Sequence, residues 1–196
     1  MNHQQSNQKY SFGFTLIELL LVIVISSGLT VAFLALYEWQ HRVLALESAR
    51  IEATRSGRIA MNHIIGELSQ STAVLTSGTF SIPGTTTITS GANAIAFSAT
   101  AVDSSDNLLY GYLDQIGYKV TSKKLYYYVK TTSGSSTRTN NTYEAIIDNI
   151  DSLAFTYDSG TPSLSTQVTV SIASTATYGK SQSTTVTLSE TVFLKQ

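Results

Sequence analysis

One apolar run constrains the fold of this chain more than any other feature of the sequence. Residues 14–37 read FTLIELLLVIVISSGLTVAFLALY, and Glu18 is their one charged side chain. The 24 residues exceed the roughly 20 that a helix needs to cross the hydrocarbon core of a bilayer. Residues 1–13 are polar, contain no acidic side chain and include Lys9, which favours a cytoplasmic amino terminus. We therefore expect a single-pass membrane segment with the rest of the chain exported.

Helical spacing continues beyond the apolar run, through residues 38–70. Apolar and small side chains recur there at steps of three, four or seven, and charged side chains fall mostly outside this stripe. The stripe consists of Trp39, Val43, Leu46, Ala53, Gly57, Ala60, Ile64 and Leu68. Because residues 14–70 contain no proline, we expect one continuous helix. Its membrane half is residues 14–37, and its amphipathic half is residues 38–70.

From residue 71 the pattern changes to the twofold alternation of β-strands. Segments rich in Val, Ile, Tyr, Phe and Thr alternate with clusters of turn-forming residues. These segments are residues 94–98, 108–113, 116–121, 125–130, 153–157, 167–172 and 185–192. A turn at residues 121–124 is expected to join two strands, and the nearly apolar-free residues 131–142 predict a mobile loop. Residues 71–196 therefore predict a β-rich globular domain whose antiparallel sheet packs on the amphipathic half of the helix, an α+β fold.

Composition argues against several classes of function. The net charge of −1 provides no basic surface for nucleic acid. The absence of cysteine excludes disulfides and thiolate metal sites. His3, His41 and His63 are far apart and are expected to be solvated rather than to bind a metal. The sequence contains no phosphate-binding loop, nucleophile elbow or metal-binding helix pair, so we expect no enzymatic activity and no catalytic residue.

Two pairs of acidic residues are candidate Ca²⁺ ligands. Asp103 and Asp106 lie in one turn cluster, and Asp148 and Asp151 lie in another. Neither pair has the ligand spacing of an EF-hand, and aspartate is common in turns for conformational reasons alone. We therefore expect no cofactor, with Ca²⁺ as the one alternative.

Glu18 is the residue whose position most needs explanation. A carboxylate inside a membrane helix costs about 2.5–3.5 kcal/mol on insertion scales, and the leader supplies only Lys9 as a nearby charge. Cleavage after Gly13 would create a partner, the α-amino group of Phe14, within the same chain or on a neighbouring one. A pair between chains would set the axial register of an assembly. Gly13 itself suits a peptidase that binds the chain in extended form, because glycine places no side chain in a tight pocket.

The stretch from Gly13 to Glu18, GFTLIE, followed by LLLVIVIS, resembles the type IV prepilin leader motif. That motif is shared by type IV pilins, competence pilins and the pseudopilins of type II secretion. The resemblance implies that residues 1–13 are a leader peptide, that a prepilin peptidase cuts after Gly13 and N-methylates Phe14, and that Glu18 guides assembly. It also implies a pilin fold, with other pilin or pseudopilin subunits and an inner-membrane assembly platform as partners. The precursor would lie in the bacterial inner membrane with its carboxy-terminal domain in the periplasm, before entering a filament.

Three further stretches resemble the J-type minor pseudopilins and W-type minor pilins: residues 58–69, 116–130 and 145–157. This resemblance implies a structural minor subunit at or near the tip of a pseudopilus or pilus. Two features depart from major pilins, since the membrane half lacks a proline and a disulfide loop is impossible. Two alternatives stay open: a pilus subunit with an adhesive or DNA-uptake role, and a single-pass anchored periplasmic binding module.

Overall fold

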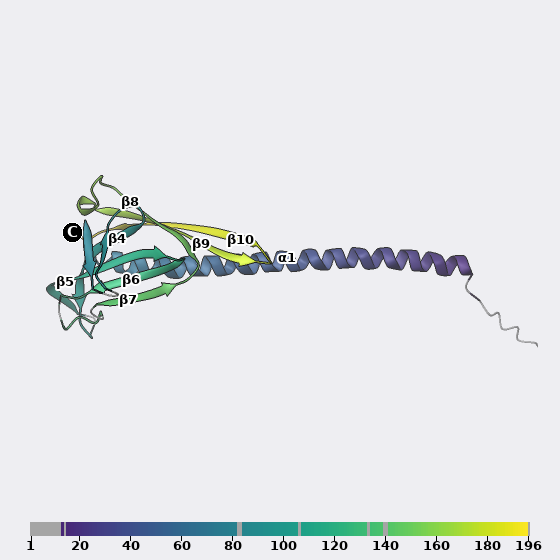
Figure 1. Ribbon diagram of the computed structural model, residues 1–196, viewed down its shortest axis with the longest axis horizontal. Coiled ribbons are helices and arrows are strands. Elements are labelled where there is room, and N and C mark those ends of the chain that lie inside the picture. The colour runs from purple at the N-terminus through teal and green to yellow at the C-terminus, as the bar shows by residue number, and fades with distance from the viewer. Residues whose placement is uncertain are drawn as a thin grey trace, which may run out of the picture. The chain divides into compact units, whose positions relative to one another are not determined.

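The computed structural model describes residue 13 and residues 15–81, 84–105, 107–132, 134–138 and 141–195 of the 196-residue chain. The chain forms two compact units, residues 1–44 and residues 45–196. Helix α1 (Leu16–Leu68) contributes residues to both units (Figure 1). The long helix expected over residues 14–70 is thereby confirmed in the described part of the chain.

Ten strands follow α1 in the described residues. They are β1 (Ser71–Leu75), β2 (Ser77–Phe80), β3 (Thr86–Thr89), β4 (Ala94–Val102), β5 (Leu108–Thr121), β6 (Lys124–Lys130), β7 (Thr142–Ile147), β8 (Ile150–Tyr157), β9 (Gln167–Tyr178) and β10 (Gln182–Phe193). A short 3-10 helix, η1 (Pro162–Leu164), lies between β8 and β9. The strands form a five-stranded sheet in the order β1-β4-β5-β6-β7, a three-stranded sheet in the order β10-β9-β8, and the pair β2-β3.

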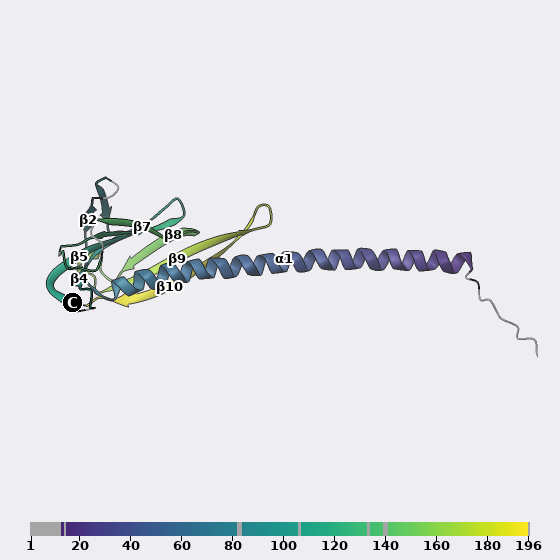
Figure 2. The same ribbon diagram turned by 90° about the horizontal axis from the view of Figure 1, so that it is seen from below.

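All strand pairings are antiparallel, as the sequence predicts. The expected turn at residues 121–124 is confirmed: Thr121 pairs with Lys124, and Ser122 and Lys123 both have positive φ, as in the tight hairpin turns that match strand twist. The expected α+β fold, a long helix packed on an antiparallel β-domain, is confirmed. The strands of that domain divide into three sheets rather than forming one. Two of these sheets meet α1 within the second unit, as Figure 2 shows for β9 and β10 beside the helix.

The main core of the second unit forms where α1 meets the two larger sheets. Ala60, Ile64 and Leu68 of the predicted stripe are fully buried there against apolar side chains of both sheets. The amino-terminal end of the stripe is not covered by other parts of the structure, since the Trp39 side chain there is 62% exposed. Burial along α1 therefore begins at Ala49 and continues to Leu68.

Gly57 allows α1 to approach β9 and β10 closely. A Cβ added there would lie 2.9 Å from Ser174 Oγ and 3.1 Å from Leu188 Cδ1, which is too close without movement of one partner. The Ser174 hydroxyl also donates a hydrogen bond to the Ala53 carbonyl, one turn earlier on the helix. The small residues at positions 53 and 57 thus fix α1 against this sheet at short range.

Arg138 joins a loop to the end of α1 through a buried polar network. Its Nη2 lies 2.9 Å from Glu67 Oε2, and its Nη1 lies 3.3 Å from Asp114 Oδ2. The Asp114 side chain is completely buried and the Arg138 side chain is 10% exposed. Ser136 Oγ also donates to Asp114 Oδ2, at 2.6 Å. The expectation of a mobile loop at residues 131–142 overlooked these polar contacts, which hold the described part of that segment.

His63 is half-buried, so the expectation of a solvated histidine is wrong at this position. Its Nδ1 lies 2.6 Å from the Tyr118 hydroxyl oxygen, and its ring meets the ring of Tyr127 edge-on. Burial lowers the pKa of His63 and raises the pKa of Tyr118 well above its usual value. Both groups are therefore neutral near pH 7 and serve as a hydrogen-bonded part of the core.

Candidate functional site

Gly13 lies just before α1, outside any regular element. Its φ does not fall in the left-handed region, and a Cβ added to it would meet no heavy atom within 4 Å. The fold of the described residues therefore does not require glycine at this position. A requirement for glycine here would have to come from something that binds the extended chain from outside, such as a peptidase.

Thr15 and Glu18 form a capping box at the start of α1. The Thr15 backbone N–H donates to Glu18 Oε2 at 2.9 Å, and the Thr15 hydroxyl donates to the same oxygen at 2.9 Å. In return, Thr15 Oγ1 accepts a hydrogen bond from the Glu18 backbone N–H at 3.3 Å. This reciprocal arrangement satisfies backbone donors that a helix otherwise leaves unpaired at its amino end, and it explains why α1 begins at Leu16.

In the capping box, only one of the two carboxylate oxygens of Glu18 accepts hydrogen bonds. The Thr15 backbone N–H and hydroxyl both donate to Oε2 of Glu18. No described residue donates a hydrogen bond to the other oxygen, Oε1. The carboxylate also lies in the first turn of α1, where the helix dipole favours negative charge.

The sequence argument missed Thr15 as a partner of Glu18. The expected partners were Lys9 and the amino group freed at Phe14, whereas a threonine three residues before a glutamate is the signature of a capping box. That signal was present in the sequence. The structure describes Gly13 and Glu18 of the expected site, whereas Phe14 and Lys9 lie outside the described residues.

Replacement of Thr15 by valine should loosen the first turn of α1. Valine keeps the shape of threonine but removes the hydroxyl that accepts from the Glu18 N–H, a cap contribution of about 1 kcal/mol. We expect the Glu18 amide of the full chain in detergent micelles to exchange with solvent about five times faster, measured by NMR. Thr15→Ser should keep the wild-type rate, as should Thr30→Val, whose hydroxyl bonds within the helix interior. Unchanged exchange in Thr15→Val would show that the capping box contributes nothing to the helix start.

The helix that follows is long and apolar enough to cross a membrane. An 18-residue window within α1 has a mean hydropathy of 2.7, and none of its residues is buried within the structure. Large apolar side chains from Leu16 to Leu36 are more than half exposed. Such a surface needs lipid or other protein to cover it.

The described aspartates of the two acidic turn clusters already have partners, either backbone N–H groups or lysine side chains. Asp103 Oδ1 accepts hydrogen bonds from the backbone N–H groups of Ser105 and Asn107, at 2.8 and 2.9 Å. These hydrogen bonds lower the pKa of Asp103, and the bond from Asn107 contributes most. Asp148 and Asp151 form exposed ion pairs with Lys124 and Lys123. Asp106 lies outside the described residues. The described residues contain no group of three or more potential metal ligands.

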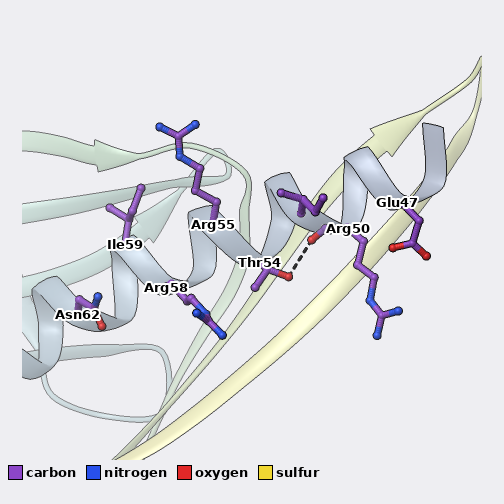
Figure 3. Close-up of a pocket in the computed structure, with 8 residues that line it drawn as sticks. Glu47, Arg50, Thr54, Arg55, Arg58, Ile59 and Asn62 are labelled. Carbon is purple, nitrogen blue, oxygen red and sulfur yellow. Dashed lines mark hydrogen bonds between the residues drawn. The ribbon is translucent and has the colours of Figure 1, made fainter. Parts of the chain in front are cut away.

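A second candidate surface is an open groove along α1 within the second unit. The side chains that line it all come from the helix: Glu47, Arg50, Ile51, Thr54, Arg55, Arg58, Ile59 and Asn62. Figure 3 shows Arg50 and Arg58 on one side of the helix and Arg55 on the other. The groove combines positive charge with Ile51, which is 67% exposed.

Comparison with known families adds one finding. Residues 8–33 match the family described as the prokaryotic N-terminal methylation motif. The match spans Gly13, the capping box and most of the apolar run, and it identifies a type IV prepilin-like signal in this part of the chain. No curated protein matches the sequence.

Proposed function

We propose that this protein is a structural, type IV pilin-like subunit that is cut after Gly13 by a prepilin peptidase, N-methylated at Phe14 and assembled into a filament. The observation that carries the proposal is the match of residues 8–33 to the methylation motif. Within that match, glycine occupies a position where the fold does not need it, directly before a helix with an acidic first turn. An external peptidase and an assembly step account for both features.

In this proposal the apolar part of α1 has two successive environments. It first anchors the precursor in the bacterial inner membrane, with the amino terminus in the cytoplasm and the β-rich domain in the periplasm. An assembly platform in that membrane then moves the cut subunit into the filament, where the same apolar surface packs against the helices of other pilin or pseudopilin subunits. Burial of apolar area stabilises both states, so little hydrophobic energy is lost in the transfer.

Glu18 has a different partner in each stage. In the precursor, Thr15 supplies two donors to one carboxylate oxygen, which lowers the cost of keeping the charge in an apolar surrounding. After cleavage, the ammonium group of Phe14 supplies a positive charge close to the other oxygen, either in the same subunit or in its neighbour. A buried pair of this kind favours the one axial register in which the two charges meet.

Within this class we propose a minor subunit at or near the tip of a type II secretion pseudopilus or a type IV pilus. The support is the resemblance of residues 58–69, 116–130 and 145–157 to J-type and W-type minor subunits. In the structure these stretches are the end of α1, the β5–β6 hairpin, and β8 with the residues before it. All three contribute side chains to the main core, including Ile64, Tyr118 and Leu153.

Replacement of Glu18 by glutamine should block entry into filaments. Glutamine keeps the side-chain shape but leaves the new ammonium group without an anionic partner, and an unpaired buried charge should lower filament incorporation by more than about tenfold. The measurement is the amount of the chain in filaments sheared from cells, relative to the amount left in the membrane. The control is Glu38→Gln in the same helix, where the glutamate forms an exposed, long ion pair with Arg42. Wild-type amounts of the Glu18→Gln chain in filaments would contradict the proposed role.

A further inference from the structure

Strand β10 presents the longest open strand edge in the described part of the chain. Its 12 residues pair with β9 on one side, and no described strand lies on the other. The opposite edge of the same sheet is partly covered, because Ile150 and Phe155 of β8 donate backbone hydrogen bonds to carbonyls outside the sheet. The edges of the five-stranded sheet, β1 and β7, are only five and six residues long. The backbone groups along β10 are thus available to a further strand.

β10 also lacks the features that usually keep strand edges from pairing. It contains no proline, lysine or arginine, its pairing with β9 has no bulge, and Glu190 is its one charged residue. Its outward side chains are mostly small hydroxyl residues that bond across to β9, as in Ser189 with Ser171 at 2.9 Å and Thr185 with Thr175 at 2.8 Å. Nothing on this outer side of β10 repels an incoming backbone.

The inner side of β10 lies beside a groove that an added strand would fill. The groove runs between α1 and β10 and is lined by Arg58, Met61, Asn62, Leu188, Ser189 and Glu190. Val186 and Leu188 point toward α1 but are only half-buried. A strand placed next to β10 would project alternate side chains under the helix and complete the burial of both residues.

Two arginines of α1 beside this groove indicate that the added strand should carry acidic side chains. Arg50 and Arg58 lie on the same side of α1, and Arg58 lines both the helix groove and the groove beside β10 (Figure 3). Arg50 and Arg58, like Arg55, have no ion-pair partner among the described residues, whereas Arg42 and Arg138 do. Acidic side chains on the helix-facing positions of an added strand would complement both arginines. They would lie away from Glu190, which lines the same groove and would repel an acidic side chain directly opposite.

We propose that the edge of β10 is a strand-acceptor site for an extended, acidic segment of a different subunit of the same filament. The segment adds to the β10-β9-β8 sheet as a fourth strand and places its acidic side chains below Arg50 and Arg58. Backbone hydrogen bonds supply affinity, and the two arginines supply selectivity. The inference rests on the proposed function, because the partner is a filament subunit.

The absence of native cysteine allows a direct test in cells. Single cysteines replace Thr187 on β10 or Ser152 on β8; both are exposed, and both pair with Ala173 from opposite sides of β9. Each full-length variant is labelled with a photoreactive maleimide, irradiated and analysed by mass spectrometry of the cross-linked peptides. We expect the label at position 187 to capture one acidic segment of another filament subunit, and the label at position 152 not to capture it.

Charge reversal tests the selectivity of the site. Combined Arg50→Glu and Arg58→Glu should reduce capture from position 187 by about tenfold, because acidic side chains would then face acidic side chains. Arg55→Glu, at an arginine that does not line the groove beside β10, should leave capture unchanged; protease resistance of each variant in cells reports whether the domain is folded. Capture of a second copy of this chain, capture of a segment without acidic residues, or no capture from a chain present in filaments would each overturn the strand-acceptor site. Absence of the chain from filaments would instead overturn the proposed function, and the inferred site with it.

Discussion

Replacement of Gly13 by leucine should leave the chain uncut. A peptidase that binds the chain in extended form has no room for a branched side chain next to the scissile bond, and misplacement by about 1 Å is enough to slow a reaction about 100-fold. The fold itself should tolerate the change, since a Cβ at position 13 would meet no atom within 4 Å. The measurement is the fraction of the full chain converted to the shorter form in a pulse-chase experiment in cells that carry the peptidase.

The matched control for this experiment is Gly28→Leu. Gly28 lies in the apolar part of α1, and a Cβ there also meets no atom within 4 Å. Because position 28 is far from the scissile bond in sequence, cleavage of this variant should proceed at the wild-type rate. Rapid cleavage of Gly13→Leu, or equal slowing in both variants, would show that Gly13 has no specific part in processing.

Replacement of Arg138 by methionine should cause a large loss of stability in the second unit. It removes the ion pairs with Asp114 and Glu67 and leaves the Asp114 carboxylate fully buried without a positive partner. Breaking a buried pair in this way typically costs about 3–5 kcal/mol of unfolding free energy. The measurement is urea unfolding of the full chain in detergent micelles, followed by near-ultraviolet signals of the tyrosines that pack in the sheets.

Two further variants identify the cause of that loss. Arg55→Met makes the same substitution at an exposed arginine of α1 and should change the unfolding free energy by less than about 0.5 kcal/mol. Adding Asp114→Asn to Arg138→Met should restore part of the stability, because the buried charge is then removed with its partner. A loss in Arg138→Met no greater than that in Arg55→Met would contradict the assigned role of the network.

The elements with a strong local pattern could be predicted from the sequence. The absence of proline from residues 14–70 and the small residues at Ala53, Gly57 and Ala60 predict α1 and its buried face. The alternation in residues 167–172 and 185–192 predicts β9 and β10. Strands β1, β2, β3 and β7 were not predicted. Short polar segments such as Thr86–Thr89 are fixed by the partner they pair with rather than by their own pattern.

Interactions between distant residues could not be predicted in the same way. Arg138 lies 24 residues from Asp114 and 71 from Glu67, and no spacing rule connects them. His63 and Tyr118 are 55 residues apart, so only the fold shows that this histidine is half-buried and bonded to a tyrosine. Thr15 differs from these cases, since its capping box with Glu18 spans three residues and follows a local rule.

The mass of the mature chain, purified from cells that make the filament, tests the central claim most directly. If the protein is a processed pilin-like subunit, the chain should begin at Phe14 and carry one added methyl group on its new amino terminus. A chain that still begins at Met1, isolated from cells with an active prepilin peptidase, would contradict both the proposed processing and the role assigned to Glu18.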